Sequence, residues 1–183
     1  MKSYIKLPIG FDVTKLKADH SRLSTSDWIA HFNTYYYEGD WSVVPLRSIG
    51  GISDHIYPDP AKTEFEDTAI LSRCPYYQEV LATFKCPLLS ARLLRLGAGS
   101  SIREHQDFNL GYEDGEIRFH IPVLTNPGVE FYLDGERIAM NEGECWYLNF
   151  NLHHKVQNNG NTDRVHLVID CVVNEWVDSL LLA

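Results

Sequence analysis

Cationic residues and long apolar runs are both scarce in this sequence. Its 183 residues include 16 Lys and Arg against 25 Asp and Glu, which gives a formal net charge of -9. Nucleic acids and anionic membrane surfaces are bound through clustered cations, and here the Lys and Arg are scattered, so we expect neither as a partner. No apolar stretch approaches the length of a membrane span, and the opening residues up to Pro8 lack the apolar run of a secretory leader. We therefore expect a cytoplasmic protein.

The four cysteines lack the spacing of a metal site or of a disulfide framework. Cys74, Cys86, Cys145 and Cys171 form no C-x-x-C pair, and most of them stand among apolar neighbours. Cysteines in such surroundings are typically buried as small hydrophobic side chains. We expect all four to be reduced, with a zinc or disulfide role as the lesser alternative.

The first 87 residues combine helical and extended patterns. Residues 24–32 begin with helix N-cap chemistry and continue with apolar positions on one helical face, which predicts a short helix. Residues 41–46 have the composition of a strand, and residues 58–60, with two prolines, that of a loop. Pro75 opens a run with apolar residues at helical spacing, so we predict a helix over residues 75–84.

From about residue 88 to residue 173 the pattern changes to short strands separated by turns, such as the hairpin signal Asp134-Gly135. The predicted strands are residues 88–96, 102–108, 117–124, 129–133, 137–140, 145–149, 154–157 and 165–173. Short strands of this kind predict a mainly β fold, a cupin-like jelly roll, with the N-terminal helices bracing one face. We expect a single domain over residues 1–183, in which residues 1–87 support a jelly-roll core of residues 88–173.

The second half carries the ligand types of a metal centre. His105 and Asp107 lie two apart in a predicted strand, so their side chains point to the same face. A further histidine begins a later strand, where the alternation with Val156 favours His154 as the third ligand and leaves His153 as the alternative. Two imidazoles and one carboxylate occupy one face of an octahedral iron and leave the other face open. A lone His-x-Asp is common by chance, so the prediction depends on all three residues together.

Arg164 begins the final apolar strand, where a buried guanidinium needs an anionic partner. A small dicarboxylate would serve, because guanidinium binds carboxylate in a bidentate fork. Such a contact would hold one end of 2-oxoglutarate while its keto acid end chelates the iron. The alternative is a structural salt bridge to Asp163 or Asp170.

Arg118 and His120 share one face of a predicted strand. Because an unpartnered buried arginine is costly, this face either opens into a polar cavity or points outward, with Phe119 and Ile121 forming the core. Arg103 lies two residues before the first predicted ligand, and we place it at the mouth of the cavity as a second substrate contact.

These residues in this order resemble the aspartyl/asparaginyl β-hydroxylase family of iron(II)- and 2-oxoglutarate-dependent dioxygenases, to which bacterial proline hydroxylases belong. The resemblance covers about residues 92–173 and is carried by Gly99-Ser100-Ser101-Ile102 ahead of His105, Arg118-Phe119-His120, Glu142-Gly143-Glu144, His154 and Arg164. It implies a double-stranded β-helix, which is a jelly roll, with His105 and His154 as metal ligands. It also implies that Arg164 binds the distal carboxylate of 2-oxoglutarate, that His120 meets this co-substrate, and that Arg118 meets a carboxylate of the substrate.

Asp107 places the chain with the proline hydroxylases, because the animal aspartyl hydroxylases have glycine at this position. The proline hydroxylases also carry additional C-terminal sequence, whereas this chain stops soon after Trp176 with the apolar tail Leu180-Leu181-Leu182. A packed terminal helix and a dimer contact are both open for this tail.

The predicted activity is therefore that of an oxidoreductase that uses Fe(II), 2-oxoglutarate and dioxygen to hydroxylate an unactivated carbon. The substrate would be an amino acid, or an aspartyl or asparaginyl residue in a peptide or protein. Two alternatives remain from other classes. One is a cupin-like metalloenzyme without 2-oxoglutarate, and the other is a non-catalytic jelly roll that binds a small acid.

Overall fold

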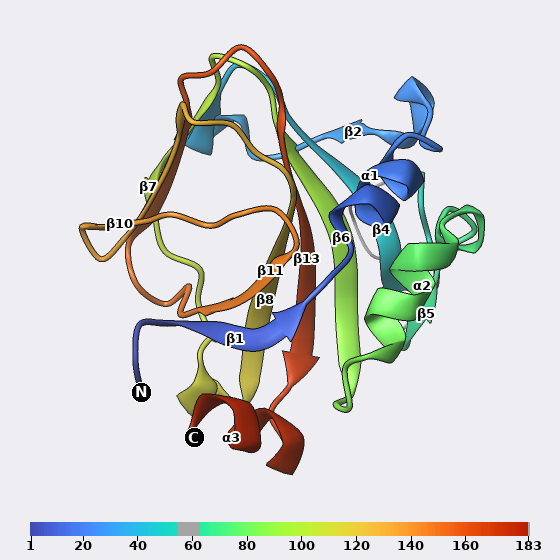
Figure 1. The fold of residues 1–183 in the computed structure, drawn as a ribbon, viewed down its shortest axis with the longest axis vertical. Coiled ribbons are helices and arrows are strands. Elements are labelled where there is room, and N and C mark those ends of the chain that lie inside the picture. The colour runs from blue at the N-terminus through green and yellow to red at the C-terminus, as the bar shows by residue number, and fades with distance from the viewer. Residues whose placement is uncertain (55–62, 183) are drawn as a thin grey trace.

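Two antiparallel sheets stacked on one another form the body of the protein (Figure 1). The computed structural model describes residues 1–54 and 63–182, so the predicted loop at residues 58–60 lies outside the described part. The large sheet contains, in spatial order, β1 (Tyr4–Gly10), β11 (Glu144–Leu148), β8 (Glu116–Leu124), β13 (Arg164–Val172), β6 (Leu88–Leu96), β4 (Trp41–Ile49) and β2 (Ile29–Ala30), with β5 (Phe65–Asp67) paired to β4. The small sheet contains β10 (Glu136–Ile138), β9 (Val129–Leu133), β12 (His154–Asn158), β7 (Ser101–His105) and β3 (Tyr37–Glu38).

This arrangement confirms the predicted jelly roll, and all eight predicted strands are present. The seventh strand in chain order, β7, is shorter than predicted, because it ends at His105 and not at Phe108. The first 87 residues do more than brace the core. They supply strands to both sheets, and β4 pairs along most of its length with β6 in the large sheet.

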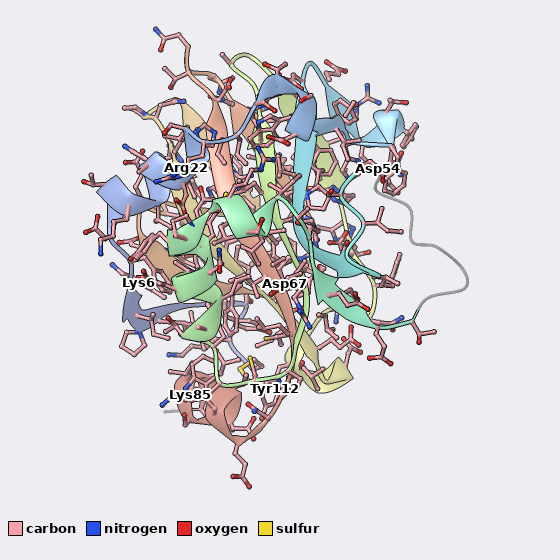
Figure 2. The ribbon with its side chains drawn as sticks, turned by 90° about the vertical axis from the view of Figure 1, so that its right-hand side faces the viewer. Lys6, Arg22, Asp54, Asp67, Lys85 and Tyr112 are labelled. Carbon is pink, nitrogen blue, oxygen red and sulfur yellow. The ribbon has the colours of Figure 1, made fainter. Side chains whose placement is uncertain are left out.

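Three helices cover the outer face of the large sheet: α1 (Val13–His20), α2 (Pro75–Ala82) and α3 (Glu175–Leu181). Pro75 opens α2 as predicted, and the helix ends two residues earlier than expected. Tyr77 ties α2 to α1, since its hydroxyl donates to the carbonyl of Leu16 at 2.9 Å. Charged side chains such as Arg22, Asp67 and Lys85 are exposed on this side of the protein (Figure 2).

The helix predicted over residues 24–32 is wrong. A single 3-10 turn at Thr25–Asp27 is followed by strand β2, whose Ile29 and Ala30 pair with β4. The capping hydrogen bond is present, since the Ser24 N–H donates to the Asp27 carboxylate at 2.7 Å. The residues that follow nevertheless pair with β4 and form a strand, so tertiary pairing overrides the local helix signal. Further 3-10 turns lie at Thr34–Tyr36, Leu71–Arg73 and Tyr112–Asp114.

The C-terminal tail forms a packed helix, the first of the two alternatives. Asn174 caps α3 by accepting from the Val177 N–H, and Val177 and Leu181 are buried in the core beneath the large sheet. All four cysteines are free thiols, and all but the half-buried Cys86 are buried, as predicted. Among the described residues no helix combines the length and apolar character that crossing a bilayer requires.

Strand alternation gives the large sheet two different faces. On β8, Phe119 and Ile121 belong to the apolar core under the helices, whereas Arg118 and His120 line a cavity on the opposite face. A second apolar cluster, which includes Phe131 and Phe150, fills the space between the sheets beside this cavity. The polar-cavity alternative is thus the one that the structure shows.

Candidate active site

The two predicted histidine ligands face each other across neighbouring strands. His105 is the last residue of β7 and His154 the first of β12, and the antiparallel register makes them direct partners. Their ring centroids are 4.3 Å apart. Asp107 lies two residues beyond the end of β7, in a segment with no regular secondary structure, where its N–H donates to the carbonyl of Phe150 at 2.9 Å. Its Oδ1 atom lies 3.8 Å from Nε2 of His105, so the predicted grouping is present although the alternation argument for it was wrong.

The hydrogen bonds of both histidines leave Nε2 free to bind a metal. Nδ1 of His105 lies 2.8 Å from the carbonyl oxygen of Arg103, and Nδ1 of His154 lies 2.9 Å from that of Leu152. A carbonyl only accepts, so each Nδ1 carries the proton and each Nε2 keeps its lone pair. Burial lowers the pKa of His154 to about 4, which keeps this ring neutral at neutral pH, as a metal ligand must be.

His105, Asp107 and His154 offer ligand atoms that all lie within 4.8 Å of one another. In the described parts of the chain this is the one such group of histidine, cysteine and carboxylate side chains. His153, the alternative ligand, is exposed and lies outside the group. The donor set of two imidazoles and one carboxylate fits a metal that keeps open coordination positions.

Arg118 is bonded to two carboxylates on the cavity wall. It binds Asp170 through Nε at 2.6 Å and through a terminal nitrogen at 3.0 Å, and its other terminal nitrogen donates to Oδ2 of Asp107 at 2.7 Å. The register of β8 and β13 places Asp170 directly opposite Arg118. Oδ2 of Asp107 is therefore held by Arg118, and Oδ1 remains for a metal.

A second arginine joins this network from the neighbouring strand. Arg92 on β6 donates to Asp170 at 3.1 Å and also to the hydroxyl of Ser90, and Ser90 itself donates to Asp170 at 2.9 Å. Burial raises the pKa of a lone carboxyl group, but here Arg118 and Arg92 outweigh it and hold the pKa of Asp170 well below its usual range. Arg92, Arg118 and Asp170 form what we call the paired cluster.

Arg164 has no carboxylate partner within the described residues. It is 2% exposed, its Nε has no hydrogen-bond partner, and a terminal nitrogen lies 3.0 Å from Nδ1 of His166. The expected alternatives of a salt bridge to Asp163 or Asp170 are therefore wrong, since Asp170 is bound to other arginines. Burial lowers the pKa of Arg164 to about 9, so the side chain is still charged at neutral pH.

A cavity of about 630 Å³ joins these groups. Its lining includes the three candidate ligands, the two arginines of the paired cluster, Arg164 and His120. His120 is 3% exposed, and its Nε2 has no hydrogen-bond partner. The prediction that Arg103 lines the mouth of the cavity is not met, because Arg103 lies on the surface and pairs with Glu38 at 2.7 Å.

No place in the site was predicted for Arg92 or His166, and Asp170 was considered only as a salt-bridge partner of Arg164. The sequence does carry a sign of His166 and Asp170, because both lie an even number of residues after Arg164 and so on the same strand face, with buried apolar residues between them. Arg92 likewise interrupts an apolar strand. Polar residues at alternate positions of a strand with two covered faces indicate a cavity on one face.

The fold and the site together define a jelly roll that carries an open metal centre beside a buried cation, and a family model agrees with this. The model of the aspartyl/asparaginyl beta-hydroxylase family matches residues 11–173, so the chain belongs to that family, as its motifs implied.

Two curated relatives are proline hydroxylases. The L-proline cis-4-hydroxylase of Rhizobium meliloti is 25% identical over 183 residues, which cover 99% of this chain and 65% of that protein. An L-proline cis-3-hydroxylase of a Streptomyces species is 26% identical over 174 residues, which cover 93% of this chain and 60% of that protein. The chain thus spans somewhat less than two thirds of the length of these relatives.

A solved structure of similar fold is an oxidoreductase of the 2OG-Fe(II) oxygenase family from Burkholderia pseudomallei. It superposes with a TM-score of 0.60 at 16% identity, over 94% of this chain and 88% of that one. At this identity the likeness concerns the fold, which is the predicted jelly roll.

Proposed function

We propose that this chain is an iron(II)- and 2-oxoglutarate-dependent dioxygenase that hydroxylates an unactivated carbon of a small amino acid. The observation that carries the proposal is the meeting, in one cavity, of a three-ligand cluster and a buried arginine without a carboxylate partner. An open metal centre alone fits many reactions. The lone guanidinium adds a place for an acidic co-substrate beside it.

His105, Asp107 and His154 would hold the metal, and Arg164 would receive the distal carboxylate of 2-oxoglutarate. When bound, iron(II) and 2-oxoglutarate supply the oxidising chemistry that places an oxygen atom from dioxygen on a C–H bond. The protein's part is placement. Arg118 keeps Asp107 turned so that Oδ1 faces the two imidazoles. His120 would lie against the co-substrate, as the family resemblance implies.

The paired cluster is our candidate for binding the substrate. Iron(II), Asp107, a dicarboxylate and Arg164 balance one another in charge, whereas Arg92 and Arg118 share one carboxylate, Asp170. One positive charge is left on this side of the cavity. A carboxylate of the substrate would compensate it and would orient one C–H bond towards the metal. The two curated relatives are hydroxylases of L-proline, which favours a free amino acid over a residue within a protein.

The test is amino-acid-dependent release of succinate from 2-oxoglutarate, with iron(II) and the twenty free L-amino acids screened in turn, L-proline first. We expect stimulation by at least one small amino acid, and we expect His154→Ala to abolish it because the cluster loses a ligand. His153→Ala is the matched control, since that neighbouring histidine is exposed. Full succinate release by His154→Ala would remove His154 from the site.

Binding of 2-oxoglutarate, measured by calorimetry with manganese(II) in place of iron, separates the proposal from its main alternative. We expect binding to the metal-loaded protein. A protein that binds the metal but not 2-oxoglutarate would instead be a cupin-like metalloenzyme without this co-substrate. A protein that binds no metal would be the non-catalytic jelly roll.

A further inference from the structure

Two buried imidazoles and Arg164 are linked behind the co-substrate end of the cavity. A terminal nitrogen of Arg164 lies 3.0 Å from Nδ1 of His166, and the same Nδ1 lies 3.1 Å from Nδ1 of His120. His166 and His120 are 2% and 3% exposed. Neither the family motif nor the proposed reaction assigns a part to His166.

The positions of the protons in this row follow from what each group can do. A guanidinium only donates, so Nδ1 of His166 must be the acceptor and cannot carry a proton. Nδ1 of His120 faces that same bare nitrogen, and it must therefore be the donor. A neutral imidazole holds one proton, so His120 keeps only a lone pair on Nε2 and His166 carries its proton on Nε2.

The tautomer of His120 that carries its proton on Nδ1 cannot donate a hydrogen bond from Nε2 to an anion. Nε2 of His120 is buried without a partner, and His120 lines the cavity with Arg164. A lone pair at this atom repels a carboxylate, whereas an N–H there would donate to it. The free protein therefore presents one matched group, Arg164, and one mismatched group, His120, to an incoming carboxylate.

We propose that His166 is a positioning residue that sets the tautomer of His120, and that the two rings exchange tautomers when a carboxylate binds Arg164. This rests on the proposed function, because it takes the carboxylate to be that of a dicarboxylate such as 2-oxoglutarate. Arg164 leaves His166 for the carboxylate, and Nδ1 of His166 then takes the Nδ1 proton of His120. As the carboxylate enters and Arg164 moves, water in the first cavity gives a proton to Nε2 of His120, and His166 releases its Nε2 proton to water in the second cavity, so no net proton is gained.

The surroundings favour an exchange between neutral rings over a charged imidazolium. Burial is the main cause that lowers the pKa of both imidazoles well below its usual range, and Arg164 adds to it. His120 also feels the positive charges of Arg118 and Arg92 and the opposing charge of Asp170. A proton added to this region would meet three guanidinium groups and one carboxylate.

His166 also has a route by which its proton can leave. It lines a second cavity of about 650 Å³, which none of the three candidate metal ligands lines and whose lining includes Asn126, Met140 and Glu142. His120 lines the first cavity and His166 the second, while Arg164 reaches both. The imidazole pair thus lies between two cavities, with His120 lining the first and His166 lining the second.

The experiment is nitrogen-15 NMR of histidine-labelled protein loaded with zinc(II), which is diamagnetic, before and after addition of succinate. Without succinate we expect His120 protonated at Nδ1 and His166 at Nε2. With succinate we expect both assignments to reverse. An unchanged pattern, or a doubly protonated His120, would overturn the exchange. The signals are assigned from single substitutions at each ring.

Two variants test the part of His166. In His166→Leu the acceptor is gone, so we expect His120 to carry its proton on Nε2 both with and without succinate. His166→Asn offers an amide oxygen that accepts from His120, and rotation of the amide then presents a donor, so we expect the reversal at His120 to return. The exposed His153→Leu is the matched control and leaves both patterns as in the unmodified protein. Reversal at His120 in His166→Leu would contradict the proposal.

The outcomes separate this inference from the proposed function. If succinate and 2-oxoglutarate bind while the tautomers stay unchanged, the exchange is wrong and the dioxygenase proposal stands. If neither dicarboxylate binds the metal-loaded protein, both are overturned.

Discussion

Arg118 on β8 and Arg164 on β13 line the same cavity from neighbouring strands, but their surroundings are opposite. Arg118 makes three hydrogen bonds to two carboxylates, and these raise its pKa even though burial alone would lower it. Arg164 is more deeply buried, has an imidazole as its neighbour, and its pKa is lowered by that burial. One cation is fixed by the protein, and the other is left for a ligand.

The contrast explains how one sheet can both hold a site together and leave it open. Removing one member of a buried ion pair destabilises the fold, because the other charge is left buried and unpaired. A charge that is buried without a partner already destabilises the fold, and a bound anion can offset that cost. Mutations at the two places should therefore have different effects on the free energy of unfolding. Removing the partner from the paired cluster should destabilise the protein, and removing Arg164 should not.

The largest effect is expected for Asp170→Asn. Arg92 and Arg118 would lose their shared carboxylate while remaining mostly buried, which typically costs about 3 to 5 kcal/mol. We expect a loss of that order in the free energy of unfolding, measured by chemical denaturation at neutral pH. The surface pair Arg47–Asp67 provides the control, because Asp67 is 62% exposed and Asp67→Asn should change stability by less than about 1 kcal/mol.

The pH dependence of Asp170→Asn sharpens the same comparison. The arginines hold the pKa of Asp170 below that of the unfolded chain, so its stabilisation is present above an unfolded carboxyl pKa of about 3.9 and is lost as the pH falls below it. The stability difference between the unmodified protein and the variant should therefore shrink at acid pH. A difference that stays constant from neutral to acid pH would show that Asp170 acts through packing and not through its charge.

The fold was largely predictable because its core strands are apolar runs separated by explicit turns. Strands β6 and β9 have the predicted bounds, since each is a run of apolar residues between explicit turns. A helix is predicted where strand β2 lies because its two residues follow the helix N-cap residues Ser24 and Asp27, whose capping hydrogen bond is present in the structure. Only the edge of β4, more than ten residues further along the chain, makes them a strand, and such a long-range pairing leaves no local signal.

The site was predictable where single residues carry a chemical role and not where residues act as partners. His105, His154 and Arg164 stand out as ligand or anion-binding types at strand ends. Asp170 does not, because its meaning depends on lying opposite Arg118, a register set by strand pairing across more than fifty residues. His166 is hidden for the same reason, since only the folded protein shows that it touches both Arg164 and His120.

Arg164→Met breaks the other side of the comparison. Methionine fills a similar space without a charge, so we expect stability to be unchanged or raised by up to about 1 kcal/mol, because the buried cation has no carboxylate to lose. Binding of 2-oxoglutarate should weaken by about 100-fold with the loss of a charge-assisted bidentate contact. Denaturation and calorimetry with manganese(II) measure the two effects. Arg103→Met, at an exposed arginine, is the control and should alter neither.

The smallest effect is expected for Ser90→Ala, which trims the paired cluster by one side chain. Its hydroxyl donates to Asp170 at 2.9 Å and accepts from Arg92, so we expect a loss of about 1 kcal/mol in stability. Affinity for 2-oxoglutarate should stay unchanged, since Arg164 is not part of this network. Ser72→Ala removes an exposed hydroxyl that bonds only to a nearby carbonyl, and it should cost less. A loss of 2-oxoglutarate affinity in Ser90→Ala would show that the two ends of the cavity are coupled, against the division drawn between Arg118 and Arg164.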